Sequence, residues 1–154
     1  MEGREINKII VHCTDSPDNM DIGFTEINQW HQERGFDGVL VGIDSHRVYC
    51  GYHYIIRRDG TTQVGRPDHY IGAHVKGYNK NSLGIVWVGK TLITPEQTAT
   101  LMTLLRMLCM RYALGINEVY GHTELNPLKS CPNLDMDKIR LDLSQMIPSS
   151  VEGI

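Results

Sequence analysis

Histidine and cysteine side chains are common ligands of metal ions, and this chain contains seven histidines and four cysteines. His12 follows a short apolar run, His122 lies in the sequence Gly-His-Thr-Glu, and Cys131 lies nine residues later in a proline-rich loop. Two imidazoles and one thiolate would leave a tetrahedral Zn²⁺ ion with one free position, which a catalytic zinc site requires. Spacing alone leaves an equal alternative, in which His12 is a hydrogen-bonded core histidine and Cys131 is a small buried apolar residue.

The elements that must position these residues follow from the hydrophobic pattern. The β-branched run Lys8–Cys13 predicts a buried strand, and the apolar run 83–88 predicts a central strand. Thr94 is expected to cap a long helix that Gly115 ends. Further strands are expected at 52–56, 61–64 and 118–120, and further helices at 25–34 and 135–144. The pattern predicts a single α/β domain over residues 1–147, with a mixed central β-sheet flanked by helices, and a frayed tail over 148–154.

Composition narrows the class of protein. The chain has 154 residues, of which 41% are hydrophobic and 21% charged, as in an ordinary globular domain. The net charge is −3 and no stripe of lysine or arginine is present, so we expect no nucleic-acid partner. No apolar run approaches the roughly 18 residues of a membrane span, so we expect no stable membrane insertion. We also expect a monomer.

Five short motifs occur in an order that is specific for one family. They lie at residues 10–13, 30–36, 51–60, 72–85 and 121–132. With these motifs the chain resembles the amidase family that includes short bacteriophage lysozymes, which are N-acetylmuramoyl-L-alanine amidases, and peptidoglycan recognition proteins. The resemblance extends over about residues 6–143. It implies zinc-dependent hydrolysis of the amide bond between N-acetylmuramic acid and L-alanine in bacterial peptidoglycan.

The resemblance also implies roles for single residues. The metal ligands of the family match His12, His122 and Cys131, and residues implicated in catalysis match Tyr52 and Lys129. A hydroxyl or an ammonium group could donate to the oxygen that becomes negative when the amide is attacked. Either side chain could also protonate the leaving amine, as could the zinc-bound water. The alternatives are that Tyr52 is only a packed strand aromatic and that Lys129 is a solvated loop residue.

Substrate contacts are expected in the glycine-rich loop before the central strand. The family lines its peptide-binding groove there, and the resemblance points to His74 and Asn81. The alternative is that the polar groups of this loop satisfy its own backbone. Alternation along a strand excludes His53 if Tyr52 faces the metal, and excludes the side chain of Cys13 if His12 faces it.

The chain departs from the family between Phe36 and Gly51, where several additional residues predict a flexible extra wall near the groove. Two other functions stay open: a non-catalytic peptidoglycan-binding module, and an amidase that cleaves another peptidoglycan bond. Cys131 and Tyr52 favour the enzyme, since non-catalytic relatives usually lack the cysteine. The first residues hold no apolar stretch of signal-peptide length. We therefore expect synthesis in the cytoplasm and action on the cell wall after release or export.

Overall fold

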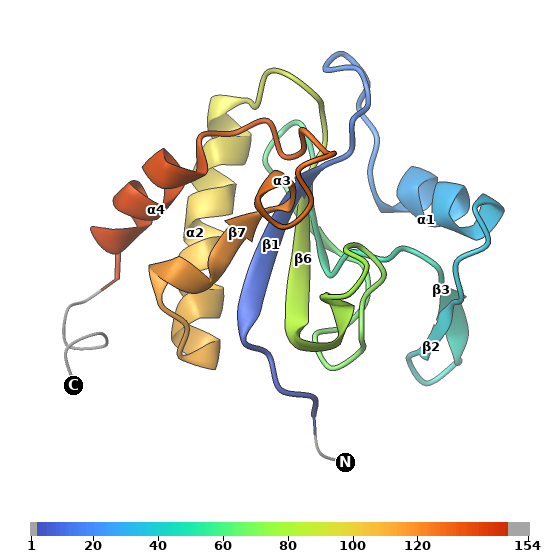
Figure 1. The fold of residues 1–154 in the computed structure, drawn as a ribbon. Coiled ribbons are helices and arrows are strands. Elements are labelled where there is room, and N and C mark those ends of the chain that lie inside the picture. Colours follow the sequence, from blue (N-terminus) through green and yellow to red (C-terminus); the bar gives the residue numbers. More distant parts are fainter. Residues whose placement is uncertain (1–2, 148–154) are drawn as a thin grey trace.

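A five-stranded mixed sheet forms the centre of the computed structural model, which describes residues 3–147 (Figure 1). The strands are β1 (Lys8–Cys13), β4 (Tyr54–Ile56), β5 (Thr62–Val64), β6 (Ser82–Trp87) and β7 (Val119–Gly121), in the spatial order β5-β4-β6-β1-β7. β1 pairs in parallel with β6 and β7, β4 pairs in parallel with β6, and β5 is antiparallel to β4. The predicted α/β fold with a mixed sheet is confirmed. The predicted tail 148–154 lies outside the described residues.

One face of the sheet is covered by two helices, α2 (Pro95–Tyr112) and α4 (Met136–Ser144) (Figure 1). We call it the closed face. Alternate residues of β1 point into it, among them Val11 and Cys13, and they join one apolar cluster with residues of α2 such as Leu105. The burial of this cluster removes apolar area from water and is the main source of stability in the domain.

Helix α2 begins as predicted and ends earlier than predicted. The Thr94 hydroxyl accepts a hydrogen bond from the Gln97 amide, while the Gln97 side chain accepts one from the Thr94 amide. At the other end Ala113 adopts a left-handed conformation with φ of 55°, two residues before Gly115. Leu114, the residue after this turn, is buried in the closed-face cluster. The expected stop at Gly115 was therefore wrong by two residues.

The other face, which we call the open face, carries α1 (Phe24–Glu33) and a separate hairpin of β2 (Val39–Val41) and β3 (His46–Val48). The hairpin is the segment predicted to be a flexible wall. It is an antiparallel ribbon beside α1, and the Tyr70 hydroxyl donates a 2.5 Å hydrogen bond to the Leu40 carbonyl. The segment is therefore a short extra element of two paired strands, and none of its residues lines the cavity that it was predicted to wall.

Short helical turns complete the fold. Two 3₁₀ turns, η1 (Asn79–Asn81) and η2 (Ile116–Glu118), and one short helix, α3 (His122–Leu125), were not predicted. α3 follows β7 directly, so His122 is its first residue. Within residues 3–147, no helix combines the length and the apolar character that crossing a membrane requires.

Candidate active site

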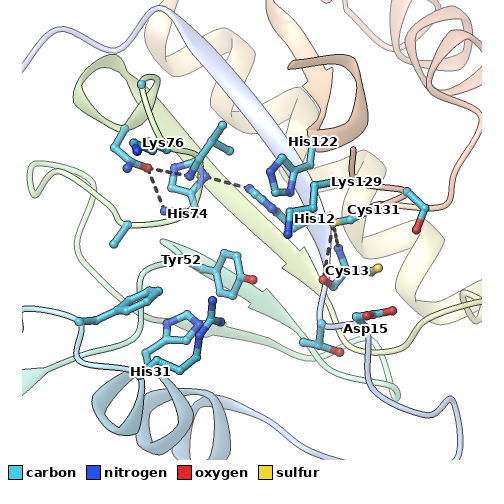
Figure 2. Close-up of a pocket in the computed structure, with 18 residues that line it drawn as sticks. His12, Cys13, Asp15, His31, Tyr52, His74, Lys76, His122, Lys129 and Cys131 are labelled. Carbon is cyan, nitrogen blue, oxygen red and sulfur yellow. Dashed lines mark hydrogen bonds between the residues drawn. The ribbon is translucent and has the colours of Figure 1, made fainter. Parts of the chain in front are cut away.

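A cavity of about 710 Å³ opens on the open face, at the carboxyl ends of the parallel strands β1 and β7. This edge of an α/β sheet is the usual place for ligands. Three residues from distant parts of the sequence converge there: His12, His122 and Cys131 (Figure 2). Their ligand atoms all lie within 4.8 Å of one another. The structure thus brings together the three residues that the sequence singled out.

Strand β1 sends His12 and Cys13 to opposite faces of the sheet. His12 lines the cavity and is 1% exposed, whereas the Cys13 side chain packs in the closed-face cluster. Cys13 is not one of the three candidate ligands, as predicted, but it lines the cavity and its thiol lies beside Cys131. Its backbone also takes part in the site. The Cys13 amide donates to Cys131 Sγ at 2.9 Å. A hydrogen bond of this kind stabilises a thiolate.

The turn that carries His122 is braced by an acidic residue. Glu124 Oε1 accepts a 2.8 Å hydrogen bond from the Gly121 amide, and both Glu124 oxygens accept from Arg140 at 2.9 and 2.8 Å. The Arg140 guanidinium holds the pKa of Glu124 below its usual value. Glu124 is not among the residues that line the cavity. Its contacts fit the role of bracing the turn, and its position outside the cavity does not favour general-base catalysis.

The loop that carries Cys131 is tied to the rest of the domain on both sides of the sulfur. The Thr123 amide donates to the Cys131 carbonyl at 2.7 Å, and the Trp87 indole donates to the Pro132 carbonyl at 3.0 Å. Trp87 is fully buried, so the second bond fixes the loop to the end of β6. The position of the sulfur is therefore set by the sheet and by α3.

The protonation states of the two histidines suit a metal ion, whereas that of Cys131 would change on metal binding. Burial lowers the pKa of His12 well below its usual value, and the neighbouring His122 lowers it further. Burial followed by the charge of Lys129 lowers the pKa of His122. Both rings are thus neutral near pH 7, as imidazole ligands must be. The adjacent Cys13 thiol and burial raise the pKa of Cys131, so without a cation the sulfur is a protonated thiol. A metal ion that binds there would have to displace this proton.

Tyr52 faces this cluster from the floor of the cavity. Its ring centroid lies 5.2 Å from that of His12 and 5.4 Å from that of His31. Burial raises the pKa of its hydroxyl, which therefore keeps its proton and acts as a donor at neutral pH. Figure 2 shows no hydrogen bond from this hydroxyl to the residues around it. Lys129 lies on the Cys131 loop, and its exposed side chain extends into the cavity.

The two predicted substrate contacts differ in position. His74 lines the cavity, but its Nδ1 lies 2.8 Å from His12 Nε2 and its Nε2 lies 3.2 Å from Ser82 Oγ. Asn81 does not line the cavity, and its side chain donates to the Glu5 carbonyl. Asn79 lines it instead and accepts from the amides of His74 and Val75. The contacts of His74 and Asn81 with substrate stay predictions.

His53 stays out of the cavity, as predicted, although strict alternation is not the reason. The Gly65 amide donates to the His53 carbonyl and the Arg66 amide to the Tyr52 carbonyl. These bonds precede the regular part of β4. Tyr52 packs against a second apolar cluster, on the open face, which includes Ile55 and Val86, whereas Tyr54 packs in the closed-face cluster. In an ideal strand Tyr52 and Tyr54, which are two residues apart, would lie on the same face of the sheet. The chain therefore departs from strict alternation just before β4.

Sequence reasoning missed one wall of the cavity. His31, Arg34 and Phe36 line it from α1 and the following turn. His31 is not among the residues that the sequence singled out, and its Nδ1 accepts a 2.8 Å hydrogen bond from the Gly51 amide. Its spacing of three from Arg34 places both on one helix face, which is a signal that could have found them. The hairpin segment 37–50 contributes no lining residue.

Comparison with known proteins decides the family. The family described as N-acetylmuramoyl-L-alanine amidase matches residues 2–134, a span that contains all three candidate ligands. The chain belongs to the N-acetylmuramoyl-L-alanine amidase family. It is therefore an enzyme that hydrolyses an amide bond of bacterial peptidoglycan. The endolysin of Enterobacteria phage K11 is 36% identical to this amidase over 143 residues, which cover 88% of the chain and 85% of that endolysin.

Solved structures agree with the fold of this amidase. The amidase LysC from Clostridium intestinale URNW matches it with a TM-score of 0.76 at 28% identity, over 92% of this chain and 87% of LysC. The complex of peptidoglycan recognition proteins LCa and LCx with tracheal cytotoxin contains a similar fold. Its TM-score is 0.68 at 24% identity, over 88% of this chain and 81% of that chain. The predicted family and fold are both confirmed.

Proposed function

We propose that this amidase is a zinc enzyme that cleaves the bond between N-acetylmuramic acid and L-alanine, with His12, His122 and Cys131 as its metal ligands. The observation that carries the proposal is the convergence of two neutral imidazoles and one cysteine within 4.8 Å inside a cavity. A non-catalytic binding module would need no such set. The complete ligand set and the free hydroxyl of Tyr52 both favour hydrolysis.

The donor set fits zinc by its chemistry. Two nitrogen ligands and one sulfur ligand form a three-residue set that leaves the fourth tetrahedral position free for water or substrate. A zinc ion held there would polarise the amide carbonyl and lower the pKa of a bound water to about 7. The Cys13 amide would steady the thiolate of Cys131, because it already points at the sulfur.

Tyr52 and Lys129 would stabilise the negative charge that develops on the carbonyl oxygen and supply the proton to the leaving amine. The Tyr52 hydroxyl keeps its proton and forms no hydrogen bond with the other cavity-lining residues drawn in Figure 2, so it can donate to the carbonyl oxygen as that oxygen gains negative charge. Lys129 lies in the lining of the same cavity and can stabilise the same charge or protonate the leaving amine. The size of the cavity suits a stem peptide, since pockets of about 300–1,000 Å³ are typical for ligands of that scale.

Mass spectrometry of digested peptidoglycan tests the function. The proposal predicts new L-alanine amino termini on released peptides and glycan strands that keep free lactyl groups on muramic acid. Fragments cut within the stem peptide would instead support the alternative amidase. Binding to peptidoglycan without any released product would support the non-catalytic module. A chelator-treated sample serves as the control in each case.

The working form that we propose is a monomer that acts on the cell wall after release or export, without nucleic acid and without stable membrane insertion. Light scattering after size-exclusion chromatography tests whether the protein is a monomer, and a mass near twice that of one chain would contradict it. Fractionation of producing cells tests where the protein is located, since we expect it in the cytoplasm before lysis.

A further inference from the structure

A chain of three polar side chains runs from the candidate metal ligand His12 into the sheet. His12 Nε2 lies 2.8 Å from His74 Nδ1, and His74 Nε2 lies 3.2 Å from Ser82 Oγ (Figure 2 shows the first contact). Ser82 is fully buried at the start of β6. Both ring nitrogens of His74 are therefore engaged within the protein, although the ring lines the cavity.

Backbone packing holds the His74 ring in this position. A Cβ atom added to Gly84 would lie 2.7 Å from His74 Cγ, and one added to Gly72 would lie 2.8 Å from His74 Cδ2. Only glycine at these two positions leaves room for the ring. The amide of His74 also donates to Asn79 Oδ1 at 2.8 Å, which fixes the backbone of the residue. The ring occupies a slot built for it.

The direction of the two hydrogen bonds follows from the chemistry of a metal ligand. Because His12 Nε2 is occupied by His74, only His12 Nδ1 is free to bind a metal ion. A metal-binding histidine donates the hydrogen on its other nitrogen to an acceptor. His74 Nδ1 must then be that acceptor, so its hydrogen lies on Nε2 and is donated to Ser82 Oγ.

We propose that His74 is a positioning residue, which holds His12 in the orientation and tautomer that metal binding requires. This inference rests on the proposed zinc function, because it needs His12 to be a ligand. It gives His74 a different job from the substrate contact expected from the sequence. It also fits the glycine at position 84, because the three atoms nearest to a Cβ added there all belong to the His74 ring.

Two conservative substitutions separate this role from simple packing. In His74→Asn the amide oxygen takes the place of Nδ1 and can still accept from His12. In His74→Gln the amide reaches the place of Nε2, and the acceptor facing His12 is lost. Loss of such an outer partner typically weakens metal affinity by about 10- to 100-fold. We expect a loss of this size for His74→Gln and an affinity much closer to wild type for His74→Asn.

Competition with a chromophoric chelator measures the zinc affinity of each purified protein without reference to activity. His31→Leu is the matched control, because it removes another buried ring from the same cavity that contacts no candidate ligand. Its zinc affinity should equal that of wild type. Circular dichroism establishes that each variant is folded.

The outcomes separate this inference from the proposed function. Equal affinities for both His74 variants, whether unchanged or equally weakened, would overturn the positioning role, because the position of the acceptor would then not matter. A loss in His31→Leu as large as in His74→Gln would overturn it as well. A wild-type protein that binds no zinc would instead overturn the proposed function itself.

Discussion

The closed and open faces of the sheet use the same strands for different purposes. On the closed face, Val11 and Cys13 of β1 pack with Leu105 of α2 in one continuous apolar cluster. On the open face, the same strand presents His12 to a cavity, where His74 contacts it by a hydrogen bond. Stability is therefore expected to depend mainly on the first face and chemistry on the second. Substitutions matched across the two faces can break this division.

The largest expected effect is on activity, at the candidate metal ligands. Cys131→Ser should lower amidase activity by more than about a thousandfold, because a water without its metal keeps a pKa far above 7. Turbidity loss of purified peptidoglycan measures this. Cys109→Ser is the matched control, since Cys109 is buried on the closed face. It should lose stability and keep its activity below the unfolding temperature, and a Cys131→Ser variant with full activity would rule out the site.

A smaller loss is expected at the tyrosine hydroxyl. Tyr52→Phe should lower kcat by about 10²- to 10³-fold, the usual effect of removing one donor to a developing oxyanion. Zinc content should not change. Tyr54→Phe is the comparison, because the Tyr54 hydroxyl donates to Asp68 at 2.6 Å and its ring packs in the closed-face cluster. Equal kcat losses in the two variants would remove the special role of Tyr52.

A substitution in the apolar cluster of the closed face tests whether stability depends on this face. Leu105 is fully buried, so Leu105→Ala should lower the free energy of unfolding by about 2–5 kcal/mol. Urea denaturation measures the change, and zinc content and activity at low temperature should stay near wild type. If zinc were lost together with stability in the still-folded protein, the two faces would not be independent.

The smallest effect concerns pH. Burial lowers the pKa of His53, whose ring lies 5.9 Å from that of His74, to about 4. In the unfolded chain the His53 ring takes up a proton near pH 6.5, but in the folded protein it stays neutral down to about pH 4. Stability from the neutral ring is thus complete above pH 6.5 and is lost as pH falls toward 4.

The slope of the unfolding free energy against pH measures this in chelator-treated protein. His53→Asn, which can still accept a hydrogen bond, should reduce the slope between pH 6 and 4.5 by up to about 1.4 kcal/mol per pH unit. An unchanged slope would mean that His53 is already protonated in the folded protein.

Patterned parts of the molecule were predictable from sequence. β1 matches its predicted range, and the Thr94 side chain caps α2 as predicted. The three candidate ligands were found because the family motifs around them are specific, whereas spacing alone left them ambiguous. Local pattern suffices where a hydrophobic period or a cap decides the structure.

Partnerships between distant residues were not predictable. The partner of His74 is His12, 62 positions away, and nothing local in the glycine-rich loop indicates it. The hairpin of β2 and β3 has strands of only three residues, partly exposed, which carry no clear alternation. The α1 wall with His31 was missed because a packed helix and a cavity wall share the same period.

Metal content tests the central claim most directly. Elemental analysis of protein purified without chelator should give close to one zinc ion per wild-type chain and almost none for His12→Leu. Removal of the zinc should abolish peptidoglycan hydrolysis, and its return should restore it. A wild-type protein that hydrolyses peptidoglycan fully with almost no bound metal would contradict the assignment of His12, His122 and Cys131.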